Sequence, residues 1–371
     1  MARDGRWDPC ISHRGAEVDG FVANYFPLAD RQVLLIAGAG FDPRSTAVAT
    51  RLAASGVPLR ALFLQENRPN PAQGLVQRAT ANTDALLGTL ANREMVAVDI
   101  FGADGAVTGG RNAITLLSRQ DFRGLTDVVI DISALSVGTS FPIIRYFVER
   151  VERGRGPPNI HIFVAHDPKL DAEIRSIPSD SPGYVHGFKG GSTLDGSASA
   201  AKLWLPQLAT GRSTALGRLF DFVGPHDTCP IFPFPASDPR LADALAEEYL
   251  VELESTWLVD TRNIVYADEA DPLDLYRTIL RLDDLRKPVF AGAGGSLLVL
   301  SPLGSKVMAL GALLAALERD LPVAHLEPIG YDLASAVPAA IAAPSLVHVW
   351  LEGDAYPTPR PALQAEGASR R

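Results

Sequence analysis

Short apolar segments alternate with segments of helical spacing over most of this chain. One example is the apolar run at 33–40, which ends in glycines and leads into a helical pattern at 45–55. Parallel strands require this arrangement, because a long crossover must carry the chain back to the start of the next strand. The alternation therefore predicts an α/β fold with two Rossmann-like lobes, each a mostly parallel sheet flanked by helices.

The length of 371 residues favours two domains, and the pattern indicates where they divide. Residues 1–30 are predicted to form an N-terminal arm, 31–200 the first lobe and 201–356 the second. The segment 178–198 is rich in Gly, Ser and Pro, which predicts a mobile loop or linker. Residues 357–371 are polar and rich in Pro and Ala, and we expect a flexible tail there.

Both predicted lobes carry the same alternation, without a convincing repeat in the sequence itself. The predicted strands are apolar runs bounded by turn-forming residues: 33–40, 59–65, 95–101, 127–133, 159–165, 216–224, 262–267, 296–300, 322–327 and 346–352. The predicted helices have apolar residues three and four apart: 45–55, 72–93, 110–118, 139–152, one beginning at 166, 238–254, 271–285 and 304–320.

Composition and charge exclude several classes of protein. Asp and Glu number 43 against 34 Lys and Arg, and the net charge of −9 disfavours duplex nucleic acid as a partner. No apolar run reaches the roughly 18 residues of a transmembrane helix, and the first residues lack the apolar core of a secretory signal. Cys10 and Cys229 cannot build a disulfide framework, so we expect a cytoplasmic protein without a metal site. A protein partner or a second copy of the chain stays open.

The glycine-containing segment 38–44 is the first candidate for chemistry. It connects a predicted strand to a predicted helix, where backbone N–H groups can bind a ligand at the helix N-terminus. Gly38 and Gly40 would let a ligand approach the backbone closely, and Asp42 and Arg44 would lie at the same edge of the sheet. Glu66 ends the next predicted strand, where an acidic residue commonly accepts hydrogen bonds from ribose hydroxyls.

The segment LLIAGAGFDPR (34–44) resembles motif I of class I methyltransferases, in particular the GAGxDxR form of the leucine carboxyl methyltransferase group. The resemblance covers about 15 residues, including the start of the helix that follows. It implies a Rossmann-like fold, a nucleoside-type cofactor and a ribose-binding role for Glu66.

A second strand-to-helix segment, SPLGSK at 301–306, has the groups that phosphate binding needs. Ser301 and Ser305 offer hydroxyls, Gly304 offers a flexible backbone and Lys306 a positive charge at a helix N-terminus. The chain has only five lysines, so a lysine in such a loop is less expected as background. An N-capping serine beside an exposed lysine would give the same pattern.

The longer segment LLVLSPLGSKVMALGALLAALE (297–318) is similar to the strand–loop–helix opening of CARF-type Rossmann domains. Those domains sense cyclic oligonucleotides in prokaryotic antiviral systems. The resemblance implies that the chain would bind a signalling nucleotide without turning it over.

Histidine is sparse, and His166 beside Asp167 is the best candidate for acid–base chemistry because it follows a predicted strand. His161 and His325 lie inside strand patterns and are predicted to be core or sheet-face residues.

Three functions remain open from these patterns. The first is binding of a nucleotide-like or phosphorylated small molecule in a cleft between two lobes, with group transfer as the enzymatic form. The second is a non-catalytic sensor or regulatory subunit of the CARF type. The third is a scaffold subunit with a degenerate site, because no complete catalytic constellation can be written down.

Overall fold

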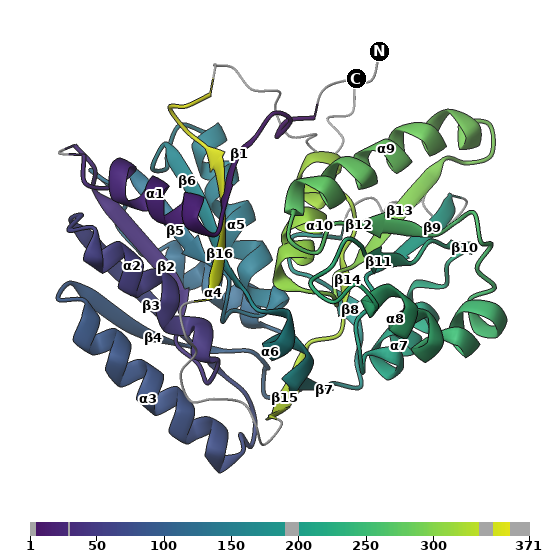
Figure 1. The fold of residues 1–371 in the computed structure, drawn as a ribbon, viewed down its shortest axis with the longest axis horizontal. Helices are drawn as coiled ribbons and strands as arrows, with labels where there is room; N and C mark the ends of the chain where they lie inside the picture. The colour runs from purple at the N-terminus through teal and green to yellow at the C-terminus, as the bar shows by residue number, and fades with distance from the viewer. Residues whose placement is uncertain (1–4, 29, 190–199, 334–343, 357–371) are drawn as a thin grey trace. The chain divides into compact units, whose positions relative to one another are not determined.

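The computed structural model of the protein describes residues 5–28, 30–189, 200–333 and 344–356. The chain divides into two compact units, each made of separate segments. The large-sheet unit consists of the described residues of Cys10–Ile177 and Pro328–Arg360, and the small-sheet unit of those of Met1–Pro9 and Pro178–Glu327. The predicted α/β class is confirmed, since a large and mostly parallel sheet is flanked by helices (Figure 1).

The large-sheet unit is built on a seven-stranded sheet with the order β1-β16-β6-β5-β2-β3-β4. Its strands are β1 (Ile11–Arg14), β2 (Val33–Gly38), β3 (Leu59–Asn67), β4 (Arg93–Asp99), β5 (Asp127–Asp131), β6 (Asn159–His166) and β16 (Ser345–Glu352). The strands from β4 to β6 are parallel, and β16 runs antiparallel to both β6 and β1. The order reverses between β2 and β5, which makes this the switch point where open α/β sheets bind ligands.

Helices cover both faces of this sheet, as the complete burial of β2 requires (Figure 1). The helical segments are α1 (Ala16–Tyr25), the 3₁₀ turn η1 (Pro43–Thr46), α2 (Ala47–Ala54), α3 (Gln73–Thr89), α4 (Gly109–Leu117), α5 (Val137–Glu152) and α6 (Pro168–Glu173). Apolar side chains of α1, α2 and α3 form one core cluster with Leu35, Phe63 and Phe163 of the sheet. A strand β7 (Ile174–Pro178) follows α6 and pairs with β15 (Pro328–Leu333).

The small-sheet unit repeats the parallel part of this strand order in a smaller form. Its strands are β8 (Gly183–Tyr184), β9 (Ala201–Pro206), β10 (Asp227–Thr228), β11 (Ile231–Pro233), β12 (Val265–Ala267), β13 (Ser296–Ser301) and β14 (Ala324–His325). β9 pairs in parallel with β10 and β13, and β11 with β12. Isolated parallel pairs, Gln207–Ile231 and Leu300–Val323, extend this pattern on both sides. The parallel order is therefore β12, β10/β11, β9, β13 and Val323, with its switch point between β9 and β13.

The helices of this unit are α7 (Ser213–Val223), α8 (Leu241–Glu248), the π-helix η4 (Glu252–Thr256), α9 (Pro272–Phe290) and α10 (Lys306–Arg319). The prediction of a strand at 216–224 is wrong, because this segment is helix α7. Leu216, Leu219 and Val223 are its buried residues, and their spacing of three and four places them on one helix face. The helix predicted from 166 ends at Glu173, where β7 begins.

The ends of the chain enter the sheets in ways the pattern did not show. Residues predicted as an N-terminal arm form β1 and α1, and β1 is an edge strand of the large sheet. The strand at 346–352, assigned to the second lobe, is β16 and pairs with β6 of the large-sheet unit. Residues 190–198 of the predicted loop and the tail 357–371 lie outside the described residues. Within the described residues, no helix is long and apolar enough to span a membrane.

Candidate functional site

The glycine loop after β2 lies at the switch point of the large-sheet unit. Gly38 is the last residue of β2, and a Cβ atom there would lie 2.8 Å from both the carbonyl carbon and the oxygen of Ala134. Gly38 therefore permits the turn between β5 and α5 to pass close to β2. A Cβ atom at Gly40 would meet no atom of the described residues within 4 Å, so the described part of the chain leaves open space at the second glycine.

Two buried polar side chains fix the path of this loop. Asn82, on α3, donates hydrogen bonds from Nδ2 to the carbonyl oxygens of Gly40 at 2.8 Å and Asp42 at 3.0 Å. The carboxylate of Asp42 accepts a hydrogen bond from the backbone N–H of Arg44 and so caps η1. The loop is preorganised, because two of its backbone carbonyls and the N–H of Arg44 already have hydrogen-bond partners.

Arg44 is buried between two carboxylates. Its Nη2 lies 2.8 Å from Asp42 Oδ2, its Nη1 lies 2.7 Å from Asp171 Oδ1, and its side chain is only 3% exposed. Burial lowers the pKa of Arg44, but the charges of Asp171 and Asp42 outweigh this effect and raise it above the ordinary value. The structure thus places Arg44 in an ion cluster that joins the β2 loop to α6.

Glu66 lies at the N-terminus of α5. Its Oε1 accepts hydrogen bonds from the backbone N–H of Ser136 at 2.9 Å and from the Ser136 hydroxyl at 3.0 Å. Its Oε2 accepts one from Arg68 Nη1 at 2.7 Å. A carboxylate offers about four acceptor positions, so Oε2 keeps one that no described residue fills. Glu66 itself accepts from the backbone N–H of the N-cap residue, at the helix N-terminus where a phosphate would otherwise bind.

Asp131, at the end of β5, is fully buried and close to this cluster. Its Oδ1 accepts hydrogen bonds from the backbone N–H and the hydroxyl of Ser133. Burial raises the pKa of Asp131 to about 7, and the charge of Asp42 adds to the effect against the hydrogen bonds from Ser133. The side chain is 1% exposed, which keeps it out of contact with solvent.

The two residues of the predicted acid–base pair, His166 and Asp167, have different roles in the structure. Asp167 accepts a hydrogen bond from the backbone N–H of Leu170 and caps α6. Both ring nitrogens of His166 are buried and have no hydrogen-bond partner in the described part of the chain. His166 is therefore a polar ring at the edge of the sheet that a ligand could satisfy.

The second predicted loop, 301–306, lies at the switch point of the small-sheet unit. Ser301 is fully buried, and its hydroxyl accepts from Trp204 Nε1 at 2.9 Å and donates to the Ala324 carbonyl at 3.0 Å. Ser305 caps α10 by accepting from Met308 N–H at 3.2 Å, and Lys306 is the first residue of that helix.

The remaining residue of this loop, Gly304, packs against Gln207. A Cβ atom at Gly304 would lie 3.0 Å from Gln207 Oε1. That oxygen is buried and has no hydrogen-bond partner among the described residues. The two serines of the loop thus satisfy the protein's own groups, whereas Gln207 Oε1 leaves one buried acceptor beside the loop.

In the large-sheet unit, the structure places Gly38, Gly40, Asp42 and Arg44 at the end of β2, and Glu66 near the end of the paired strand β3. In the small-sheet unit, it places Ser301, Gly304, Ser305 and Lys306 between β13 and α10. Sequence reasoning missed Asn82, Arg68 and Asp171. Asn82 could have been suspected, since asparagine in mid-helix is unusual unless its side chain has a partner. Arg68 lies only two positions from its partner Glu66, so this pair could also have been suspected. Asp171 carries no local signal, because its partner Arg44 is 127 positions away.

Negative charge dominates the edge of the large sheet. Asp42, Asp171 and Glu66 outnumber their partners Arg44 and Arg68, even before Asp131 ionises. Among the described residues, no group of three or more His, Cys, Asp or Glu side chains is arranged to hold a metal ion. Comparison with known proteins adds no relative, since no protein-family model and no curated protein matches the chain.

Proposed function

We propose that the large-sheet unit binds a nucleoside-type ligand at the β2/β5 switch point, as the cofactor of a group transferase. The observation that carries the proposal is the open space that the described residues leave at Gly40, where the strand order reverses. Glu66 lies near the end of β3, the strand that pairs with β2. Ligands of open α/β sheets bind at this position. Glu66 keeps one acceptor position, which suits a ribose hydroxyl.

The charge at the edge of the large sheet limits which class of ligand can bind there. The surplus of carboxylates would repel a pyrophosphate or triphosphate, and the negative charge of Glu66 already lies at the N-terminus of α5. A neutral or positively charged nucleoside derivative fits the edge better than NAD or ATP. The sulfonium cofactor S-adenosylmethionine has this charge, which agrees with the methyltransferase-like glycine loop.

Isothermal titration calorimetry of the full chain with S-adenosylmethionine, NAD and ATP tests the ligand class. We expect heat with S-adenosylmethionine, and none with NAD or ATP at the same concentration. No heat with any of the three, together with no nucleotide carried through purification, would exclude the cofactor site. Heat with ATP alone would contradict the charge argument.

The Glu66→Gln variant tests the position of the ligand. It keeps the shape of the side chain but removes its charge, and we expect affinity for S-adenosylmethionine to fall by about tenfold or more. Glu94→Gln is the matched control, because Glu94 is an exposed carboxylate on β4 away from the glycine loop. Equal affinities of the two variants would place the ligand elsewhere. A thermal melt of each variant separates lost binding from lost folding.

A second candidate function concerns the small-sheet unit, where Gln207 Oε1 is a buried acceptor beside Gly304 at the switch point. There the 301–306 loop would sense a signalling nucleotide. A thermal-shift screen with cyclic oligoadenylates tests it: a shift without consumption of the ligand supports sensing, and turnover supports an enzyme. If no nucleotide binds to either unit, the scaffold function is the one left. In each case we place the protein in the cytoplasm, where both cysteines would stay reduced.

A further inference from the structure

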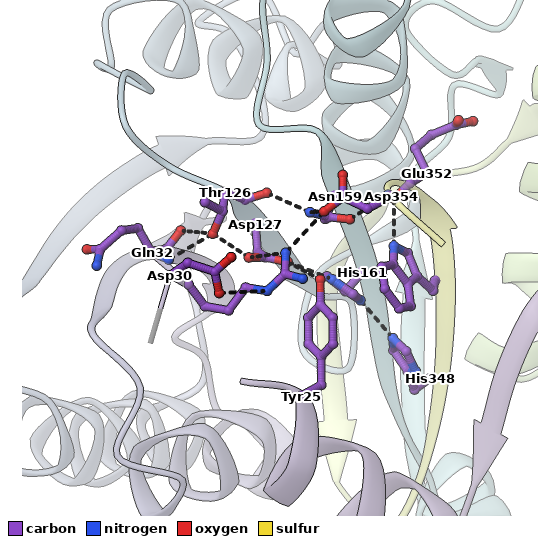
Figure 2. A network of polar contacts seen from close by, with 12 residues as sticks. Tyr25, Asp30, Gln32, Thr126, Asp127, Asn159, His161, His348, Glu352 and Asp354 are labelled. Carbon is purple, nitrogen blue, oxygen red and sulfur yellow. Dashed lines mark hydrogen bonds and ion pairs between the residues drawn. The ribbon is translucent and has the colours of Figure 1, made fainter. Parts of the chain in front are cut away.

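Three histidines and an aspartate form a hydrogen-bonded chain across four neighbouring strands of the large sheet. Asp127 on β5 lies 3.1 Å from His161 Nε2 on β6, and His161 Nδ1 lies 3.0 Å from His348 Nε2 on β16. The other nitrogen of His348 lies 2.9 Å from Nδ1 of His13 on β1. Figure 2 shows the inner part of this chain, from Asp127 to His348.

Helix α1 covers this histidine chain, which attaches the helix to the large sheet. His161 and His348 are fully buried. Phe21 of α1 stacks on His348 with ring centroids 4.3 Å apart and on His13 at 4.8 Å. The hydroxyl of Tyr25, at the end of α1, donates to Asp127 Oδ1 at 2.8 Å. The protonation state of these histidine rings therefore decides whether α1 packs against neutral or charged groups.

The number of protons on the histidine chain follows from which of its atoms are hydrogen-bonded to one another. An ionised Asp127 only accepts, so His161 Nε2 must carry a proton. If His161 is neutral, its Nδ1 accepts from His348 Nε2–H, and a neutral His348 in turn accepts from His13 Nδ1–H. All three contacts are then satisfied by three neutral rings, and only His13 Nε2 remains as an acceptor.

Added protons have unequal effects on this chain. One extra proton can enter at His13 Nε2 without breaking a contact, because each contact still holds a single proton. A second extra proton must put two N–H groups opposite each other, either between His161 and His348 or between His348 and His13. That contact then turns repulsive, beneath the ring of Phe21.

Burial favours neutral inner rings. Burial lowers the pKa of His161 although Asp127 opposes it, and burial together with His161 and His13 lowers the pKa of His348 well below its usual value. Burial also lowers the pKa of His13, against the charge of Glu17. The other titratable or charged groups around the histidine chain lie on α1, on the segment after it, at the end of β16 and beyond it: Tyr25, Asp30, Arg31, Glu352 and Asp354.

We propose that this histidine chain is a pH-sensitive attachment, which holds α1 against the sheet at neutral pH and releases it on acidification. The attached state keeps the inner rings neutral, whereas a released segment lets them protonate near their ordinary value. Attachment is thus complete above about pH 6.5 and is lost as the pH falls, by up to about tenfold per pH unit for each ring held neutral. This inference is independent of the proposed function, because Asp127 begins β5 whereas the glycine loop follows the end of β2.

Hydrogen exchange of the full chain, corrected for intrinsic rates, tests the proposal between about pH 7.5 and about pH 5. We expect protection of the α1 amides to fall by at least about tenfold over this range, while protection of α5 in the same unit is retained. Unchanged protection of α1 at pH 5 would overturn the proposal, and so would parallel loss in α1 and α5.

The double variant His161→Gln/His348→Gln identifies the groups responsible. Each glutamine amide can donate on one side and accept on the other, so the chain of contacts is kept without a titratable ring. We expect protection of α1 to become insensitive to pH. His226→Gln, in the small-sheet unit, is the control and should behave as the wild type. A pH response of the double variant equal to that of the wild type would contradict the proposal.

Nitrogen NMR of the histidine rings gives a readout that does not depend on the double variant folding. At neutral pH we expect His161 and His348 as Nε2–H tautomers and His13 as the Nδ1–H tautomer. His13→Gln removes the outer ring and should leave the two inner tautomers unchanged. Protonated inner rings at neutral pH, or a bare Nε2 on His161, would overturn the proposal.

Discussion

Asp131 illustrates at the residue scale how burial sets the chemistry of a side chain at the end of a strand. A carboxylate usually ionises well below neutral pH, but full burial raises the pKa of Asp131 to about 7. The unfolded chain loses this proton at a lower pH than the folded chain does. The contribution of Asp131 to stability is therefore lost as the pH rises from about 4 towards 7.

Asp131→Asn should remove this dependence, because the amide keeps the acceptor for both Ser133 donors and has no charge to bury. We expect the free energy of unfolding of the variant, relative to the wild type, to increase between about pH 4.5 and about pH 7.5. Urea denaturation at both pH values measures it. If the difference in free energy of unfolding between the two proteins were the same at both pH values, Asp131 would be ionised in the folded state at both.

Single residues were predictable from the sequence where their role is local. The turn at Gly38 and Gly40 and the acid at Glu66 follow from the strand–loop–helix pattern. The partners of these residues were not predictable, because Ser136 lies 70 positions from Glu66 and meets it only once the sheet order is set. His161 was predicted as a core or sheet-face residue, but its link to His348 depends on the pairing of β6 with β16.

At the scale of elements, the pattern predicted most strands and helices but not which strands pair. The apolar run at 346–352 was predicted as a strand, yet only packing decides that β16 joins the large sheet between β1 and β6. Helix α7 was misread as a strand because its segment is short and rich in apolar and aromatic residues, which strands also favour.

Two mid-helix glycines allow the effect of helix propensity on stability to be distinguished from the effect of packing. Gly311 lies where α10 passes α9, and a Cβ atom there would collide with the carbonyl oxygen of Pro272 and lie 3.0 Å from Leu275 Cβ. We expect Gly311→Ala to lower the free energy of unfolding by about 1–3 kcal/mol, although alanine is the better helix former.

Gly217 of α7 is the matched control, since a Cβ atom there meets nothing within 4 Å. Gly217→Ala should raise the free energy of unfolding by about 0.5–1 kcal/mol. Denaturation midpoints of both variants provide the comparison. A gain in stability at Gly311 equal to that at Gly217 would show that α9 and α10 do not need a glycine to pack together.

At the scale of the whole molecule, both units are assembled from separate parts of the chain. The N-terminal segment Met1–Pro9 belongs with Pro178–Glu327, whereas Cys10–Ile177 belongs with Pro328–Arg360. A length of 371 residues and an alternating pattern can predict two sheets, but not that residues 5–9 belong to the small-sheet unit and residues 344–356 to the large-sheet unit. This arrangement leaves each unit dependent on residues that are distant in sequence.

Trp7 tests this dependence in the small-sheet unit. It is fully buried, its backbone N–H donates to Tyr276 Oη at 3.1 Å, and its ring packs edge-on against Tyr276 of α9. Trp7→Ala should lower the free energy of unfolding of the small-sheet unit by about 3–5 kcal/mol. Hydrogen exchange should show reduced amide protection in α9 and α10, while β2 and β5 stay protected. Trp350→Ala, on β16, should give the reverse pattern. If either substitution lowered protection equally in both units, the two units would unfold as one cooperative structure, and the division of the chain would have no energetic counterpart.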